Sequence, residues 1–133
     1  MDSVEISVHT GSDVVVDITD RISAFCKKHG SGLLHVFAPH ATAGLALMET
    51  GSGSEQDLTR LLGRILPRDD RYTHRHGSPG HGADHLLPAL IAPFLVLAVV
   101  SGKPLLGAWQ SVVLIDPNRD HTTRTVRLSF LAG

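Results

Sequence analysis

The stretch 94-FLVLAVVSGKPLLGAWQSVVLIDPNRDHTTRTVRLSFL-131 decides the fold, because it contains three strand-like segments in direct succession. Residues 94–100, 107–115 and 122–131 are rich in valine, leucine, isoleucine and threonine, as expected of strands. Between them, residues 101–104 and 116–120 carry the glycine, proline, asparagine and aspartate typical of turns. Consecutive strands joined by short turns pair antiparallel, so an antiparallel sheet is predicted.

Further elements are expected upstream of this stretch. Apolar alternation over residues 4–8 and 14–18, on either side of Gly11-Ser12, predicts a β-hairpin. Ser52, followed three residues later by Glu55, is typical of a capping box at the start of a helix. The remaining expected segments are a helix through 21–26 that stops by Gly30, strands near 33–37 and 45–49, a helix up to Pro67, and a short helix over 84–91. The predicted fold class is α+β: one domain (1–133) with an antiparallel, jelly-roll-like β-sandwich and two or three flanking helices.

Composition excludes several classes of protein. The chain has 133 residues and a formal net charge of −1, with lysine and arginine scattered along it, so we expect no nucleic-acid partner. The uncharged segment 86–100 is shorter than the ~20 residues that span a bilayer, so we expect no membrane partner either. Cys26 is the only cysteine, which favours a reducing compartment and hence a cytoplasmic location.

The chain contains nine histidines, and several lie in a polar segment after Pro67. A loop of this length in a small domain is usually functional. His74 lies in the loop, His85 opens the short helix that follows it, and His40 ends an apolar strand. Three imidazoles with one open coordination position are typical of a catalytic zinc site. The sequence therefore predicts a divalent metal, zinc first, held by His40, His74 and His85.

Two other histidines of the loop, His76 and His81, are left open as additional ligands. His81 would share a helix face with His85 only if the helix began at His81, and the flanking Gly80 and Gly82 disfavour that. Imidazole also suits copper, iron, nickel and cobalt, so the ligand types alone do not identify the metal. The alternative interpretation is a solvated histidine-rich loop whose members do not act together. His9, His29, His35 and His121 are interpreted as residues without a functional role.

Arg124 lies in register with the apolar residues of the last predicted strand, so it needs a carboxylate or a bound anion as partner. Glu49, which ends an apolar run, is a candidate carboxylate. A strand over 107–115 would place Gln110 on the face opposite Trp109, and Trp109 itself is interpreted as a core anchor.

Three separated motifs resemble the YjbQ-like family, also called uncharacterised protein family 0047. They are residues 40–45 (HATAGL) followed by Glu49, residues 72–74 (YTH) followed by His85, and Gly102 followed by GAWQ at 107–110. The resemblance extends over residues 9–133. It implies an antiparallel β-sandwich with flanking helices, a homotrimer, and a metal site at His40, His74 and His85.

Family members are named secondary thiamine-phosphate synthases, which join a pyrimidine pyrophosphate to a thiazole phosphate and release pyrophosphate. The resemblance thus implies small anionic, phosphorylated substrates, with Glu49, Gln110 and Arg124 as catalytic residues. Two alternatives remain open. One is metal-activated hydrolysis of a small phosphorylated metabolite; the other is a non-catalytic trimeric binding module with a structural metal.

Overall fold

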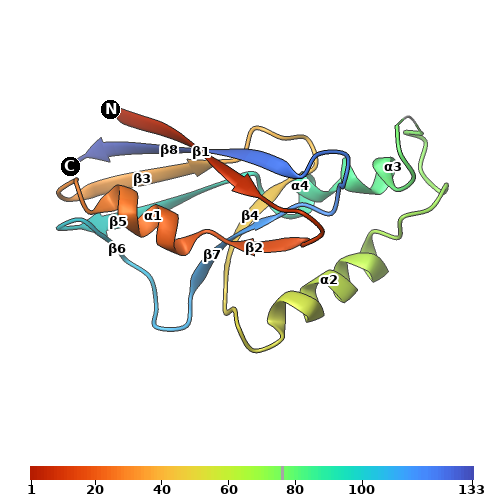
Figure 1. The fold of residues 1–133 in the computed structure, drawn as a ribbon, viewed down its shortest axis with the longest axis horizontal. Helices are drawn as coiled ribbons and strands as arrows, with labels where there is room; N and C mark the ends of the chain where they lie inside the picture. The colour runs from red at the N-terminus through yellow and green to blue at the C-terminus, as the bar shows by residue number, and fades with distance from the viewer. Residues whose placement is uncertain (76) are drawn as a thin grey trace.

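The computed structural model describes residues 1–75 and 77–133. Two antiparallel sheets and four helical segments account for its regular structure within these ranges (Figure 1). The elements in chain order are β1 (Asp2–His9), β2 (Val15–Asp17), α1 (Thr19–Cys26), β3 (Gly32–Phe37), β4 (Gly44–Met48), α2 (Ser54–Ile65), α3 (His81–Asp84), α4 (Leu87–Leu90), β5 (Phe94–Val100), β6 (Lys103–Pro104), β7 (Ser111–Ile115) and β8 (Thr123–Ala132).

The larger sheet has the strand order β1-β8-β3-β5-β6, with β3 at its centre and β8 between β1 and β3. Residues in β8 alternate between the two faces: Val126, Leu128 and Phe130 point inward and are buried, whereas Arg127 and Leu131 are exposed. The smaller sheet has the order β2-β7-β4, and its middle strand β7 is buried over residues 112–115. Both faces of β7 are covered, since Val112 and Leu114 pack in the main core and Val113 and Ile115 in the second cluster, which explains its continuous apolar run.

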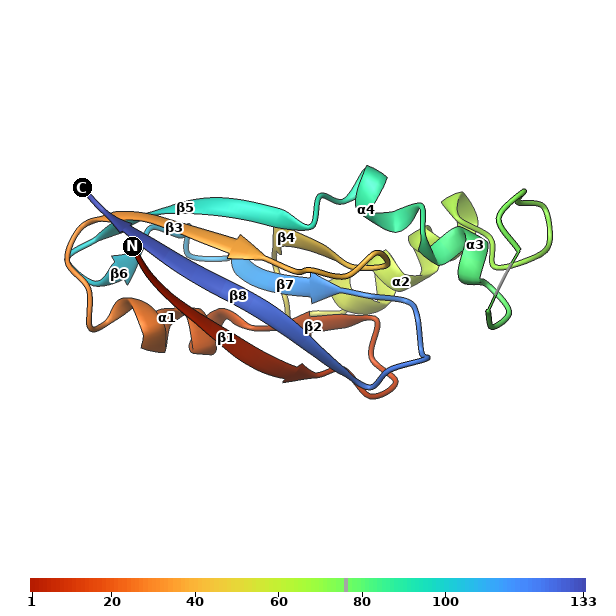
Figure 2. The same ribbon diagram turned by 90° about the horizontal axis from the view of Figure 1, so that it is seen from above.

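The two sheets curl around a shared apolar core (Figure 2). Inward residues of β3, β5 and β8 pack against residues of β4 and β7, and α1 closes the core with Ile22, Phe25 and Cys26. A second, smaller cluster forms where α2 (Leu62, Leu66) and the α3–α4 segment pack on β7. Both chain termini lie at one end of the molecule, and α3 and α4 lie at the other (Figure 1).

The predicted hairpin at Gly11-Ser12 is wrong. Strand β1 pairs with β8 and β2 pairs with β7, so the chain crosses from one sheet to the other at this turn. Local alternation specifies that each segment is a strand but not which partner it takes. Here the long β8 offers β1 an eight-residue register, from Asp2↔Phe130 to His9↔Thr123, which a hairpin with the three-residue β2 could not match.

The helix starts also differ from prediction in their details. Helix α2 begins at Ser54 after Gly53 in the left-handed region, with no side-chain cap on its first turn, although the Glu55 carboxylate accepts a hydrogen bond from the N–H of Gly51. Two single turns, α3 and α4, replace the one short helix expected over 84–91. Helix α3 begins at His81, because Gly80 takes a φ of 85°.

The α+β class and the antiparallel pairing are confirmed, together with the strands near residues 33–37, 94–100 and 122–131. The jelly-roll-like sandwich is not confirmed, since the strands divide five and three between the sheets. Over the described ranges, none of the helices has the length and apolar character needed to cross a membrane.

Leu128 is fully buried on β8, between β1 and β3 of the larger sheet, so Leu128→Ala is expected to lower the free energy of unfolding by about 2–5 kcal/mol. Leu61→Ala removes the same atoms from a half-exposed site on α2 and is expected to cost about 1 kcal/mol or less. Urea unfolding followed by circular dichroism measures both. Equal losses would place β8 outside the core.

Candidate functional site

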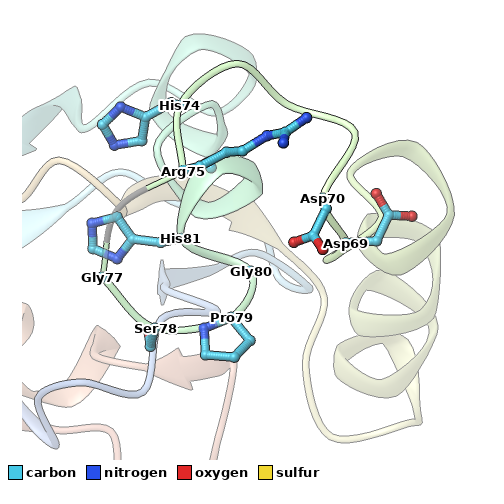
Figure 3. A pocket seen from close by; sticks show the side chains of 10 residues that line it. Asp69, Asp70, His74, Arg75, Gly77, Ser78, Pro79, Gly80 and His81 are labelled. Atoms are coloured by element: carbon cyan, nitrogen blue, oxygen red, sulfur yellow. The ribbon is translucent and has the colours of Figure 1, made fainter.

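Three histidines meet where the loop after α2 returns to α3. His81 and His85 lie one helical turn apart, and their Nε2 atoms are 2.6 Å from each other. The rings of His74 and His81 are stacked, with centroids 5.8 Å apart, and lie on the same side of the loop (Figure 3). One nitrogen from each of His74, His81 and His85 lies within 4.8 Å of the other two. We call these three residues the histidine cluster.

The close contact between His81 and His85 restricts their charge. Two ring nitrogens at this distance share one proton in a hydrogen bond, in which one ring donates and the other accepts. The cluster therefore holds at least one neutral imidazole, the form that binds a metal. His74 is exposed and the other two rings are half-buried, so the cluster opens to solvent on one side.

A hollow of about 300 Å³ lies on one side of the cluster, and we call it the histidine pocket. Residues from four separate segments of the chain meet there. They are Pro39, His40, Ala41, Thr42, His81, His85, Asn118, Asp120, His121 and Arg124. A second hollow of about 210 Å³ lies within the loop itself and shares His74 and His81 with the cluster (Figure 3).

His40 lies in the histidine pocket but is anchored to β8. Its Nε2 is 3.0 Å from the backbone nitrogen of Thr125 and 3.1 Å from the backbone oxygen of the same residue. Either tautomer therefore engages Nε2 with the strand, which leaves Nδ1 as the ring nitrogen for a ligand. Burial, and then the charge of Arg124, hold the pKa of His40 below its ordinary value, so the ring favours the neutral form.

Arg124 is buried in the wall of the pocket, as its position in the strand pattern predicts, and it has a carboxylate partner. That partner is Asp116 at the end of β7, with Nε to Oδ2 at 2.7 Å, rather than Glu49. Thr42 joins the pair: its hydroxyl donates to Asp116 Oδ1 at 2.9 Å and accepts from Arg124 Nη2 at 3.2 Å. Within the described part of the chain, Arg124 Nη1 has no hydrogen-bond or ion-pair partner.

Two more carboxylates border the cluster. Asp120 Oδ2 lies 3.5 Å from His81 Nδ1, and the hydroxyl of Ser78 helps to hold the pKa of Asp120 below its ordinary value. Asp84, directly before His85, is buried and pairs with Arg68 at 3.1 Å. Burial raises the pKa of Asp84 despite that pairing.

The residues predicted from sequence are thus only partly brought together. His40, His85 and Arg124 line one pocket, and His74 meets His85 in the cluster, with His81 as the third member. Residue 76, the other open candidate, lies outside the described residues.

Glu49 and Gln110 do not line the histidine pocket. Glu49 is exposed after β4, and Gln110 lies in a turn, where its Oε1 accepts a hydrogen bond from the N–H of Gly107 at 2.8 Å. The expected strand therefore starts at Ser111, after Gln110. The interpretation of Trp109 as a core anchor is wrong, because its side chain is 77% exposed beside that turn.

Sequence reasoning missed six residues of the site, among them Thr42 and His121, the second of which was interpreted as having no functional role. Asp116, Asn118 and Asp120 were interpreted only as turn formers, and Asp84 only as a helix start. The sequence carries one sign of the residues in segment 116–120. This segment has three side chains able to accept hydrogen bonds, more than a tight turn needs.

Comparison with known proteins identifies the family. The profile described as "UPF0047 protein YjbQ-like" matches residues 4–133. The chain belongs to the UPF0047 YjbQ-like family. A UPF0047 protein of Mycobacterium tuberculosis is 57% identical over 133 residues, covering 100% of both chains. One from Archaeoglobus fulgidus is 29% identical over 92% of this chain and 96% of its own length.

Solved structures of similar chains share the fold. A hypothetical protein of Aeropyrum pernix superposes with a TM-score of 0.91 at 25% identity and covers 100% of both chains. A conserved hypothetical protein of Thermus thermophilus gives a TM-score of 0.84 at 31% identity, covering 96% of this chain and 99% of its own. The family resemblance drawn from the three motifs is therefore confirmed.

Removing Arg124 would leave the charge of Asp116 buried without a cation. Arg124→Met is expected to lower the free energy of unfolding by about 3–5 kcal/mol, and adding Asp116→Asn should recover most of the loss, because the amide keeps an acceptor without the charge. Arg127→Met, which removes an exposed pair with Glu5, is the control and is expected to cost about 1 kcal/mol or less. Denaturant unfolding measures all four chains. A double variant no more stable than Arg124→Met would contradict the buried pair.

Proposed function

We propose that this UPF0047 protein binds one divalent metal ion per chain, zinc first, at the histidine cluster and uses it to bind a small phosphorylated substrate. The observation that carries the proposal is the convergence of three imidazole nitrogens within 4.8 Å beside a pocket that contains Arg124. The ligand set combines His74 and His85, proposed from the sequence, with His81. His40 faces the same pocket and is the candidate fourth ligand or substrate contact.

The donor set fits zinc. Four tetrahedral ligands at zinc–nitrogen distances near 2.0–2.1 Å lie about 3.4 Å from one another. Small side-chain rotations would bring the three nitrogens to that spacing. They would lengthen the 2.6 Å distance between the nitrogens of His81 and His85 and shorten the longest distance within the cluster, which is at most 4.8 Å. Asp120 beside His81 Nδ1 supports the fit, because a carboxylate behind a ligating imidazole fixes its tautomer.

The other wall of the pocket suits an anion. Arg124 Nη1 is available there, and the neutral His40 and the nearby His121 add ring nitrogens. A metal bound at the cluster would act as a Lewis acid toward a phosphate oxygen. A phosphate between the cluster and Arg124 would then be held by charge on two sides, without a large rearrangement of the chain.

The reaction we propose is the one that the family resemblance implies: a pyrimidine pyrophosphate and a thiazole phosphate are joined and pyrophosphate leaves. Arg124 would stabilise the leaving pyrophosphate, while Glu49 and Gln110 keep their proposed catalytic roles only if another copy of the chain brings them to the pocket. The cytoplasmic location is proposed from the single cysteine.

Metal content decides the first part of the proposal. The chain, purified without chelator or affinity tag, is expected to carry about one zinc per chain after incubation with the metal, as measured by elemental analysis. His81→Ala and His85→Ala are expected to weaken zinc binding at least about tenfold, and His40→Ala less, because its Nε2 is held by β8. His9→Ala, at an exposed position that ends β1 and belongs to neither the cluster nor the pocket, is the control.

Turnover is then measured on the zinc-loaded protein with the two phosphorylated substrates, and on other phosphorylated metabolites with and without chelator. Zinc binding unaffected in His81→Ala and His85→Ala would overturn the metal site. Turnover that survives chelation would overturn the role of the metal while leaving the site intact.

We also propose a homo-oligomer, a trimer by the family resemblance, formed through the outer face of the larger sheet. Five apolar side chains on that face are 48–57% exposed: Leu33, Phe94, Val96, Val100 and Leu131. Cross-strand register places Leu33 beside Leu131, and His35 stacks on Phe94, so the residues form one patch. Monomers rarely expose contiguous apolar patches of several hundred Å².

A charge in this patch is expected to dissociate the oligomer. Val96→Glu should shift the mass measured by light scattering toward 14.2 kDa, the mass of one chain. Leu61→Glu, on the exposed side of α2, should leave the mass unchanged. A parent chain that runs as a monomer at micromolar concentration would contradict the proposal.

A further inference from the structure

We infer that Asn118 is a positioning residue for the histidine cluster, acting through two carboxylates, Asp84 and Asp120. Asn118 borders the histidine pocket, but its side chain is buried against helix α3 and both ends of its amide are engaged by the chain itself. The consequence for metal affinity rests on the proposed metal site, whereas the positioning itself is a property of the metal-free chain.

The two ends of the Asn118 amide are distinguished by their partners. Nδ2 donates to Asp84 Oδ2 at 3.0 Å, and Oδ1 accepts from the backbone N–H of Asp120, also at 3.0 Å. The reverse orientation would place an oxygen against a carboxylate and an NH₂ group against an N–H donor, so it is excluded. An amide is therefore required here, since neither a carboxylate nor an aliphatic side chain can satisfy both partners.

The contact with Asp84 fixes the helix that carries two of the histidines. Helix α3 is a single turn without a side-chain cap, so it cannot hold its own position by local hydrogen bonds. Asp84, its last residue, is only 1% exposed and is held from two sides by Asn118 and Arg68. His85 follows directly, and His81 begins the same turn.

The contact with Asp120 places the carboxylate that faces His81. Asn118 Oδ1 fixes the backbone of Asp120, whose Oδ2 lies 3.5 Å from His81 Nδ1. At this ion-pair distance Asp120 faces the Nδ1 edge of the ring, opposite the Nε2 that meets His85. One amide thus sets both the location of the helix and the backbone position of the carboxylate that faces His81.

The same residue joins the cluster to the arginine side of the pocket. The backbone N–H of Asn118 donates to Asp116 Oδ1 at 3.0 Å, and Asp116 holds Arg124. This backbone bond survives any side-chain substitution except proline. Changes at Asn118 therefore act on the histidines while the Asp116–Arg124 pair keeps its contact.

Zinc affinity and the metal-free ring of His81 test the inference together. Asn118→Ala is expected to weaken zinc binding roughly 10–100-fold in competition with a chromophoric chelator, the range seen when groups behind metal ligands are removed. In the metal-free chain, the same variant should change the ¹⁵N shifts of the His81 ring and speed hydrogen exchange at the amide of Asp120. Asp57→Asn, an exposed carboxylate on α2, should change none of these.

An exchange of the two partners separates positioning from general damage to the fold. Asn118→Asp sets two carboxylates against each other and is expected to weaken zinc binding at least as much as Asn118→Ala. Adding Asp84→Asn restores one donor and one acceptor to the contact and leaves an acceptor for Arg68, so the double variant should recover zinc affinity.

Two results would overturn the inference: His81 shifts and Asp120 exchange that match the parent in Asn118→Ala, or a double variant no better than Asn118→Asp in those readouts. A parent chain that binds no zinc would refute the proposed function alone, because the ring shifts and exchange rates of the metal-free variants would still decide the role of Asn118.

Discussion

The buried ion pair between Arg124 and Asp116 is the constraint on which the site depends. Both side chains are less than 10% exposed, and their closest contact is 2.7 Å. Either charge alone would be costly in this environment, so the end of β7 and the start of β8 must stay together. The connection between them is therefore anchored at both ends, and its residues Asn118, Asp120 and His121 border the histidine pocket.

Such a pair adds little net stability compared with apolar residues of the same volume. Its contribution is instead to fix the end of β7 relative to the start of β8. The stability of the molecule comes from the apolar core between the sheets, where Leu34, Leu114 and Leu128 are fully buried. The polar groups, by contrast, extend from Arg124 through Asp116 to Asn118 as one connected set. That set joins the core to the segment after α2, which also packs on the second apolar cluster through Tyr72 and Ala83.

Much of the fold was predictable, because the local pattern of apolar residues indicates where strands and helices form. The alternation in residues 122–131 gave both β8 and the inward position of Arg124. Strand partners were not predictable: β1 and β2 look like a hairpin locally and separate only because β8 is the longer partner. His81 was left open because glycines disfavour helices, yet Gly80 in the left-handed region is what allows a turn to begin there. The carboxylate partner of Arg124 was not predictable either. Asp116 lies in a segment of residues typical of a turn, so nothing in the sequence indicates that it also pairs with an arginine.

The structure also separates two kinds of histidine that the sequence treats alike. His40 is bonded to β8, so its position follows the sheet and changes little. His81 and His85 stand on a single turn placed by polar contacts, so their positions follow Asp84 and Asp120. Binding an ion requires the nitrogens of His81 and His85 to move apart from 2.6 Å. These two residues can move without disturbing a strand, whereas His40 cannot. A site built from both kinds has a rigid wall for the substrate and an adjustable wall for the ion. The apolar packing of Ala83 and the polar contacts of Asp84 together limit how far the turn that carries His81 can move, so the change must come mainly from rotation of the rings.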